Sequence, residues 1–372
     1  MASDPTAPLF VLPTLRVAGT PRAMGQAHGE SQRPLIAAFV EQRLAAAREY
    51  FGERAQASGA DAELLFTRFV DTGRACLEAA QRWDPDGTAE HTGIAEGAGI
   101  ASERLYSVAN MTDVRDVLLL PSTPDEEGCT SFLLPQALTK AGQILAGQTW
   151  DLNPQDLDYV LAVHRLPDDG PETWSVGCVG CLSLMGMNQH GLAVGTTNIK
   201  IRGSRPGIGY LSLLHRMIRA KTRTEAGQII EGAPRSAAHT YWAADAHGAL
   251  EYEVSAQSFV RREATQQPIA RSNHCLAEPH VALQGEPTGS SSQARLGRMT
   301  QILSQGQHDL DSLRAAFADR SDGVDSIARF PEDKQGTATN SCMIAAPKTR
   351  ELWACKGPSQ RGQWVKLEFE RP

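Results

Sequence analysis

The sequence predicts an α+β protein in which antiparallel sheets are covered by helices. Three observations support this class. The first third of the chain carries apolar residues at helical spacing. From Gly128/Cys129 onward the residue pattern is typical of short strands, and two helical segments precede the last strands. With 372 residues, the chain can bury a sizeable core in one large domain or two ordinary ones.

The first third is expected to form four helices. They cover residues 31–54, 61–83, 88–98 and 102–120. Asp61 is the expected N-cap of the second helix, Gly99 ends the third and Pro121 ends the fourth. The following segment, 121–128, is a polar, proline-bearing loop of the exposed kind at which chains are cut.

Strands dominate the remainder. They are expected at 129–134, 143–150, 159–165, 173–178, 182–187, 192–197, 239–245, 249–255, 257–263, 268–272, 341–346, 351–355 and 363–369, with helices at 210–221, 224–230, 292–304 and 308–318. The strand that begins at Cys129 should pair with the strand that ends at Trp150 across a hairpin. Cys129 thus begins a strand directly after an exposed loop.

Charge and hydropathy exclude several classes of partner. The formal charge is −7, from 43 acidic and 36 basic residues without long blocks, so there is no basic stripe for nucleic acid. The longest charge-free apolar stretch, 174–187, is too short and glycine-rich to span a bilayer. The N-terminus lacks the basic region of a signal peptide. We therefore expect a cytoplasmic protein that binds neither nucleic acid nor membrane.

The chain has seven cysteines, an odd number that argues against a disulfide framework. Cys178 and Cys181 form a C-x-x-C, but Cys275, Cys342 and Cys355 supply no second pair of the kind a zinc ribbon needs. Burial in a strand is the favoured interpretation of that pair, and a zinc-binding or structural module stays as an alternative. With disulfide and zinc roles set aside, chemical reactivity is the remaining reason to single out one of the cysteines.

Cleavage between Gly128 and Cys129 would create a nucleophile and its base on one residue. The new N-terminus would carry a thiol and an α-amine, and the pKa of an α-amine, about 8, suits a general base far better than that of lysine. A Gly-Cys dipeptide alone is weak evidence, because the chain contains three of them. Asp151 ends the expected partner strand, where its carboxylate either holds the amine or caps the turn before Asn153.

Five motifs appear in an order seen in one family. They are GCTSF (128–132), GQTWD (147–151), GMNQHGLAVGTTN (186–198), ARSNH (270–274) and SSQAR (291–295). This set resembles the N-terminal-nucleophile acyltransferases and hydrolases typified by acyl-CoA:6-aminopenicillanic acid acyltransferase. Two earlier segments, GTPRAMGQAHGE (19–30) and GIAEGAG (93–99), are similar to that family's helical prosegment. The resemblance therefore runs from about Gly19 to the C-terminal strands.

The resemblance implies a four-layer αββα fold and a precursor that cuts itself before its cysteine. Here the products would be an α chain of residues 1–128 and a β chain of residues 129–372 that stay associated. Positions that match the family's motifs imply the site. They are Cys129 as nucleophile, Asp151 as the acid that contacts its amine, Asn273 in the oxyanion hole, Arg295 as their support, and Asn198 and Trp150 as substrate-binding residues. Taken alone, Asn273 also fits a turn residue and Arg295 a solvated helix residue.

Some positions depart from the family or its relatives. Gln148 stands where the related bile-salt hydrolases carry an arginine, which places the chain nearer the acyltransferase branch. Residues 325–330 read DSIARF where relatives often carry Ser-Ile-Cys-Arg-His. His239 and His274 leave open a papain-like Cys–His protease, although the flanking sequence typical of papain is missing around Cys129.

The expected activity is cleavage of a linear amide of a small acylated amine through a thioester acyl-enzyme on Cys129. Acyl transfer to an amine, from an amide or a coenzyme A thioester, is the alternative, because both reactions share the acyl-enzyme. No metal or organic cofactor is required for either reaction.

Overall fold

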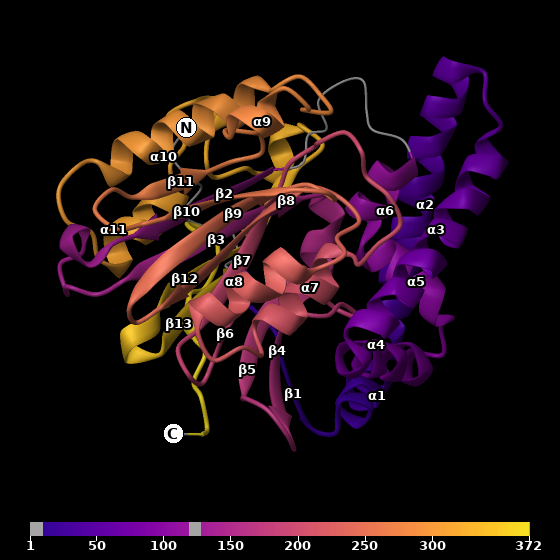
Figure 1. The fold of residues 1–372 in the computed structure, drawn as a ribbon, viewed down its shortest axis with the longest axis horizontal. Helices are drawn as coiled ribbons and strands as arrows, with labels where there is room; N and C mark the ends of the chain where they lie inside the picture. Colours follow the sequence, from indigo (N-terminus) through magenta and orange to yellow (C-terminus); the bar gives the residue numbers. More distant parts are fainter. Residues whose placement is uncertain (1–9, 119–127, 372) are drawn as a thin grey trace.

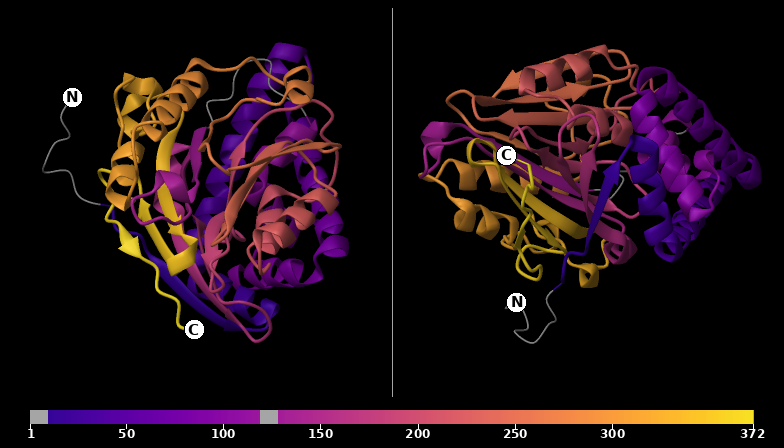
Figure 2. Two further views of the ribbon diagram at one scale, coloured as in Figure 1. Left: turned by 60° about the vertical axis from the view of Figure 1, so that its left-hand side comes forward. Right: turned by 90° about the horizontal axis from the view of Figure 1, so that it is seen from below.

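The computed structural model describes residues 10–118 and 128–371, and its centre is a pair of stacked sheets. The first sheet has eight strands in the order β1-β4-β5-β6-β7-β8-β9-β10, and the second has six in the order β11-β2-β3-β12-β13-β14. Strand β7 of the first sheet packs on β2 and β3 of the second, so the two sheets face one another (Figures 1 and 2).

The strand bounds follow the expected segments closely. The first sheet contains β1 (Thr14–Gly19), β4 (Val160–Pro167), β5 (Thr173–Cys178), β6 (Met185–Asn188), β7 (Ala193–Asn198), β8 (His239–Asp245), β9 (Gly248–Val254) and β10 (Phe259–Glu263). The second contains β2 (Gly128–Leu134), β3 (Leu145–Leu152), β11 (Ile269–Arg271), β12 (Ala338–Ala346), β13 (Glu351–Lys356) and β14 (Val365–Lys366). The predicted last strand, 363–369, is much longer than the two residues of β14.

Helices cover the outer face of each sheet. Helices α7 (Tyr210–Met217) and α8 (Arg223–Gly232) pack on β7, β8 and β9, whereas α10 (Ser290–Leu303) and α11 (Leu310–Phe317) pack on β2, β11 and β12. The short α9 (Glu278–Val281) lies near α10 at the top of Figure 1. The layer order is therefore helix, sheet, sheet, helix, which confirms the α+β class and the four-layer αββα arrangement.

Within residues 10–118, six helices gather beside the sheets, at the right of Figure 1. They are α1 (Pro21–Ser31), α2 (Arg33–Ser58), α3 (Ala62–Trp83), α4 (Pro85–Ala98), α5 (Ser102–Ala109) and α6 (Met111–Leu118). The predicted cap is confirmed, because the Asp61 carboxylate accepts the backbone N–H of Glu63 at 2.9 Å. The helix predicted over 102–120 is two helices, with Asn110 as the C-cap of α5. The predicted cleavable loop, apart from Gly128, lies outside the described residues.

Two N-terminal elements were not predicted. Strand β1 pairs in parallel with β4, in the register Thr14 to Ala162, so the first sheet is not wholly antiparallel. Helix α1 begins at Pro21 with Thr20 as its N-cap. Both elements are short, and each is secured by a partner far away in the sequence, which local periodicity does not report.

Strand alternation directs Cys129 into the space between the sheets. On β2, Phe132 and Leu134 belong to the core under α10 and α11, and the Phe132 and Phe317 rings lie 5.4 Å apart. Cys129 and Leu133 belong to the core that contains both sheets. Because successive strand residues face opposite sides, this pattern sets the side chain of Cys129 against the first sheet.

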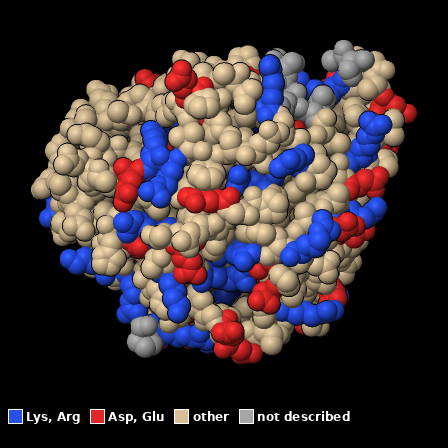
Figure 3. Space-filling view, in the orientation of Figure 1, with Lys and Arg blue, Asp and Glu red and all other residues tan. Residues whose placement is uncertain are grey.

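The surface mixes both charge signs. On the face shown in Figure 3, lysine and arginine side chains lie among aspartate and glutamate side chains. Among the described residues, no helix is long and apolar enough to cross a membrane.

Candidate active site

The β2–β3 hairpin places two of the predicted residues at the same end of neighbouring strands. Its antiparallel register pairs Gly128 with Asp151 and Cys129 with Trp150, which confirms the predicted pairing. Cys129 is 7% exposed and Asp151 1% exposed. The Asp151 carboxylate therefore neighbours the peptide bond that precedes Cys129.

Asn273 and Arg295 enclose the backbone of Cys129. The Cys129 N–H donates to Asn273 Oδ1 at 2.8 Å, and Arg295 Nη2 donates to the same oxygen at 2.9 Å. Arg295 Nη1 donates to Thr130 Oγ1 at 3.0 Å and to the carbonyl oxygen of Cys129. Arg295 extends from α10 on the outer face of the second sheet, and its fork of donors suits this set of acceptors.

The amide of Asn273 is held on all sides. Its Nδ2 donates to the carbonyl oxygen of Asn198 at 2.9 Å, and its backbone N–H donates to Ser292 Oγ at 2.9 Å. Because the Oδ1 atom faces two donors, Nδ2 is directed away from them. An amide nitrogen has two hydrogens, so the second remains able to donate to an oxyanion.

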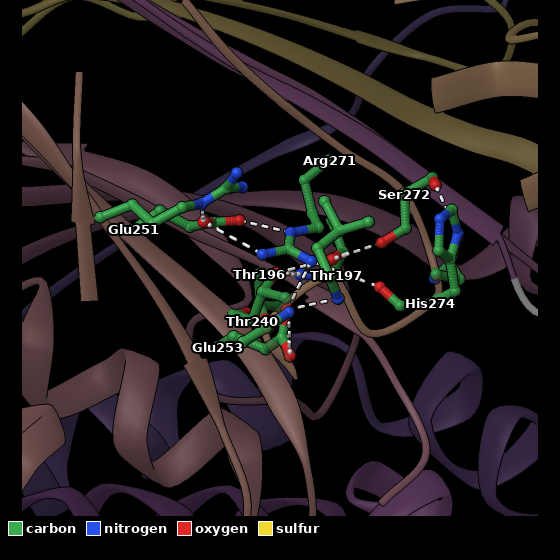
Figure 4. A network of polar contacts seen from close by, with 12 residues as sticks. Thr196, Thr197, Thr240, Glu251, Glu253, Arg271, Ser272 and His274 are labelled. Carbon is green, nitrogen blue, oxygen red and sulfur yellow. Dashed lines mark hydrogen bonds and ion pairs between the residues drawn. The ribbon is translucent and has the colours of Figure 1, made fainter. Parts of the chain in front are cut away.

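A buried ionic network anchors the turn that carries Asn273. In Figure 4, Arg271 lies between Glu251 and Glu253 of β9, and its Nη1 donates to Glu253 Oε2 at 2.7 Å. Burial alone would raise the pKa of Glu253, but the hydrogen bond with His280 and the charge of Arg271 lower it to about 2. Thr197 Oγ1 of β7 donates to the carbonyl oxygen of Ser272 at 3.2 Å. The first sheet thus fixes the turn that presents Asn273.

Asp151 is a buried carboxylate between two arginines. Burial raises its pKa, and the charges of Arg295 and Arg329 oppose that rise. The hydroxyls of Thr149 and Thr339 also favour the charged form, although neither Asp151 oxygen has a hydrogen bond of standard geometry to any described residue.

Gly128 is packed against the same group. A Cβ atom at this position would lie 2.8 Å from Arg329 Nη1 and 3.2 Å from Asp151 Oδ2, so only glycine fits without displacement.

Burial lowers the pKa of Arg295 to about 10, which leaves it charged at neutral pH. Arg329 is a site residue that sequence reasoning missed, although the departure at 325–330 pointed to the segment that contains it.

A small cavity opens beside Cys129. Its volume is about 30 Å³, and its lining includes Cys129, Trp150, Asp151, Asn198 and Asn273. Five of the six predicted residues therefore meet at one cavity, and the sixth, Arg295, bonds to two of them. A cavity of this size has room for only about one or two water molecules.

The other polar candidates occupy distinct places. His239 lines the cavity, whereas His274 bonds to Ser292 Oγ through Nδ1 at 2.8 Å. Burial and the charges of Arg271 and Arg295 lower the pKa of His274. Gln148 is buried, and its Oε1 accepts from the Thr196 N–H at 2.8 Å and from Trp242 Nε1 at 2.9 Å, so it joins the two sheets.

The C-x-x-C pair lies in the interior. Cys178 is the last residue of β5, and both it and Cys181 are buried, with their pKa values raised chiefly by burial. Across the part of the chain that the structure describes, no group of three or more His, Cys, Asp or Glu side chains is placed to hold a metal ion.

Sequence comparison identifies related proteins. The family model described as acyl-coenzyme A:6-aminopenicillanic acid acyl-transferase matches residues 138–361, more than half of the chain. The 40 kDa form of acyl-coenzyme A:6-aminopenicillanic-acid-acyltransferase from Emericella nidulans is 26% identical over 303 residues, which are 81% of this chain and 78% of that protein.

Two solved structures are similar at greater distance. Penicillin V acylase from Agrobacterium tumefaciens matches with a TM-score of 0.44 and 13% identity, over 64% of this chain and 86% of that one. A variant of conjugated bile acid hydrolase from Clostridium perfringens matches with a TM-score of 0.45 and 12% identity, over 65% of this chain and 97% of that one. These likenesses are too distant to assign a function.

The family match favours an enzyme of the N-terminal-nucleophile type over the papain-like alternative. The chain belongs to the acyl-coenzyme A:6-aminopenicillanic acid acyl-transferase family and is an amide hydrolase or acyltransferase of the N-terminal-nucleophile type.

Proposed function

We propose that the chain cuts itself between Gly128 and Cys129, and that the new N-terminal cysteine cleaves a linear amide of a small acylated amine. The observation that carries this proposal is the convergence of Asn273 and Arg295 on the backbone of Cys129, with Asp151 paired to Gly128 on the neighbouring strand. These contacts address the peptide nitrogen and carbonyl of Cys129, so they suit a residue whose own nitrogen takes part in the chemistry. The products are an α chain of 1–128 and a β chain of 129–372.

In the cleavage step, the thiol of Cys129 attacks the carbonyl carbon of Gly128. The C–N bond breaks as the nitrogen takes a proton, and a thioester joins Gly128 to Cys129. Water then hydrolyses the thioester, which releases the Gly128 carboxylate and leaves a free amine and thiol on Cys129. The absence of a side chain at Gly128 gives the backbone the freedom that this internal attack requires.

In the substrate reaction, the α-amine of Cys129 takes the thiol proton as the sulfur attacks the amide carbonyl. Asn273 Nδ2 donates to the developing oxyanion, and losing such a donor typically costs about 10²–10³ in rate. The ammonium returns its proton to the departing amine, and water releases the acid from the thioester. Asp151 holds the ammonium, and Arg295 holds Asn273 and the Cys129 carbonyl.

Acyl transfer is the second candidate. The family model and the Emericella nidulans relative are both named as acyltransferases that use acyl-coenzyme A and 6-aminopenicillanic acid. On Cys129, a coenzyme A thioester would give the same acyl-enzyme as an amide, and an amine would then replace water as the acceptor. A small amide and an acyl-coenzyme A are therefore the two donor classes for this chain, which needs no metal or organic cofactor.

Denaturing mass spectrometry tests the cleavage. Active protein should give two chains, of which the larger begins at Cys129, and incubation with an amide should add the acyl mass to that chain. Cys129→Ala should remain a single chain without activity. An intact single chain in active protein, or activity in Cys129→Ala, would contradict the proposal.

Product analysis distinguishes hydrolysis from transfer. Purified enzyme acylated by an amide or an acyl-coenzyme A is offered graded concentrations of small primary amines in water. Free acid at every amine concentration identifies a hydrolase, and an acylated amine that rises in proportion to the amine identifies a transferase.

A further inference from the structure

The cavity beside Cys129 has a second polar wall, built by His239 of β8 and Asp113 of α6. His239 is 2% exposed, and its Nε2 lies 2.5 Å from Asp113 Oδ1. The other carboxylate oxygen, Oδ2, accepts from Ser236 Oγ at 2.8 Å and from the Tyr210 N–H at 2.9 Å. Asp113 is thus an acceptor fixed from two sides, and it faces the N–H of the imidazole.

The orientation of the ring leaves an acceptor without a partner. The Tyr210 ring stacks on the imidazole at 4.9 Å and 21°. Nδ1 of His239 is buried, and no described residue forms a hydrogen bond with it. When Nε2 carries the single ring hydrogen and donates it to the carboxylate, Nδ1 is the ring nitrogen with the lone pair. Buried polar atoms are normally satisfied, so Nδ1 is an acceptor for an N–H or O–H donor that no described residue supplies.

This acceptor shares the cavity with the nucleophile. His239 and Asn198 are directly opposed in the β8–β7 register, so their side chains leave the same face of the first sheet. The carbonyl oxygen of Asn198 accepts from Asn273, which in turn accepts from the Cys129 N–H. His239, Asn198, Asn273 and Cys129 all line the one cavity.

We propose that His239 is a substrate-binding residue whose Nδ1 accepts a hydrogen bond from the N–H of the amide that is cleaved, or of the amine that accepts the acyl group. Asp113 is its positioning residue. The preferred substrates are then secondary amides, and the preferred acceptors are primary amines. This inference rests on the proposed function of Cys129 and names the class of nitrogen at that site.

The hydrogen bond has a specific task when the C–N bond breaks. The nitrogen of the tetrahedral intermediate becomes pyramidal, and its lone pair must face the ammonium of Cys129, which supplies the proton. An N–H fixed on Nδ1 sets that orientation, and His239 neither gains nor loses a proton in the step. In the transfer direction, the same contact points the lone pair of the amine at the thioester carbon.

Matched variants separate this role from a structural one. In His239→Gln, the side-chain NH₂ takes the place of Nε2–H toward Asp113, but no acceptor remains at Nδ1. In His239→Asn, the side-chain oxygen takes the place of Nδ1, but the bond to Asp113 is lost. In Asp113→Asn, the N–H of Tyr210 keeps the amide oxygen, so the NH₂ group faces His239 and forces the ring proton onto Nδ1.

The probes are acyl p-nitroanilides, the matching N-methyl-p-nitroanilides and the p-nitrophenyl esters, over a series of acyl groups. In His239→Gln and Asp113→Asn, we expect kcat/KM for the anilide to fall by about 10²-fold or more, and kcat/KM for the ester to fall far less. His239→Asn should retain part of the anilide activity. The wild type should prefer the anilide to its N-methyl form, and His239→Gln should lose that preference.

Equal losses on anilide and ester, or unchanged anilide turnover in His239→Gln, would overturn the role of His239. If the variants fail to self-cleave, the wild type decides, because equal turnover of the anilide and its N-methyl form also overturns it. Absence of an acyl thioester on Cys129 in the wild type, read by mass spectrometry, instead overturns the proposed function, and this inference with it.

Discussion

At the scale of single residues, Asn273 is the point at which the site is assembled. Its side-chain oxygen accepts hydrogen bonds from Cys129 in the second sheet and from Arg295 in α10. Its side-chain nitrogen donates to Asn198 in the first sheet. The amide does not titrate, so its donor and acceptor are both present at any working pH. Its two ends have different tasks, since the oxygen positions Cys129 and the nitrogen is the oxyanion donor of the proposed mechanism.

Two substitutions separate these tasks. Asn273→Asp keeps an acceptor for Cys129 and Arg295 but removes the donor, whereas Asn273→Ala removes both. We expect kcat to fall by about 10²–10³ in the aspartate variant, with cleavage of the precursor retained in part. The alanine variant should lose cleavage as well. Gel analysis of the precursor and kcat of the cleaved fraction check this, and equal kcat in wild type and Asn273→Asp would contradict it.

Asp151 should control the pH dependence of the reaction. In the proposed mechanism its carboxylate stabilises the ammonium form of the Cys129 amine, so Asp151→Asn should lower the pKa of that amine. The acidic limb of the profile of kcat/KM against pH should then move to lower pH, and the maximal rate should fall. Measuring this profile in both proteins decides the matter, and an unmoved acidic limb would exclude contact between the two groups.

The sequence predicted those site residues that lie in short sequence motifs. Cys129 and Asp151 were placed by strand pairing, and Asn273 and Arg295 by the resemblance. Asp113 and His239 lie 126 positions apart, and no local pattern reports that α6 packs beside β8. Arg329 was missed for the same reason, since its position beside Gly128 depends on how the 325–330 segment lies against the hairpin.

At the scale of elements, the glycines of the N-terminal motifs have a packing role. A Cβ at Gly25 of α1 would lie 2.0 Å from the carbonyl oxygen of Glu90 on α4, and a Cβ at Gly93 of α4 would lie 2.2 Å from the carbonyl oxygen of Arg22 on α1. The two helices therefore cross with their backbones in contact. The resemblance singled out these segments, and close helix packing is the physical reason for their glycines.

Alanine at this crossing should be destabilising in spite of its better helix propensity. We expect Gly25→Ala to lower the free energy of unfolding by about 1–3 kcal/mol or more, because α1 and α4 must separate. Gly52→Ala is the matched control. Gly52 lies in α2 with no atom within 4 Å of an added Cβ, so the change should be neutral or stabilising by about 1 kcal/mol. Urea unfolding of both variants measures the difference, and equal stabilities would refute it.

At the scale of the whole molecule, the two halves on either side of Gly128 are joined by buried polar contacts. Arg43 of α2 donates to both oxygens of Asp156, at 2.9 and 2.6 Å, and Arg165 of β4 contacts Glu90 of α4 at 2.5 Å. Breaking one partner of such a buried pair leaves an uncompensated charge. The proposed α and β chains should therefore stay together after cleavage.

Buried histidines should make the stability of the folded molecule sensitive to acid. His28 of α1 accepts the N–H of Gly180 at 3.1 Å, and burial lowers its pKa to about 3, while burial lowers the pKa of His91 to about 4. Unfolded histidine titrates near pH 6.5, so the unfolded chain binds more protons below that pH. The stability from the neutral rings is complete above about pH 6.5 and declines as the pH falls towards 4. Each ring contributes up to about 1.4 kcal/mol per pH unit.

His28→Gln isolates one of these rings. The glutamine oxygen can still accept the Gly180 N–H, but the side chain does not titrate, so the variant should lose less unfolding free energy than the wild type between pH 7 and 5. Urea unfolding at several pH values measures how the unfolding free energy changes with pH in both proteins. This slope should be steeper in the wild type, by the contribution of one titrating histidine. Identical slopes would show that His28 takes up its proton in the folded state, with its ring no longer accepting from Gly180.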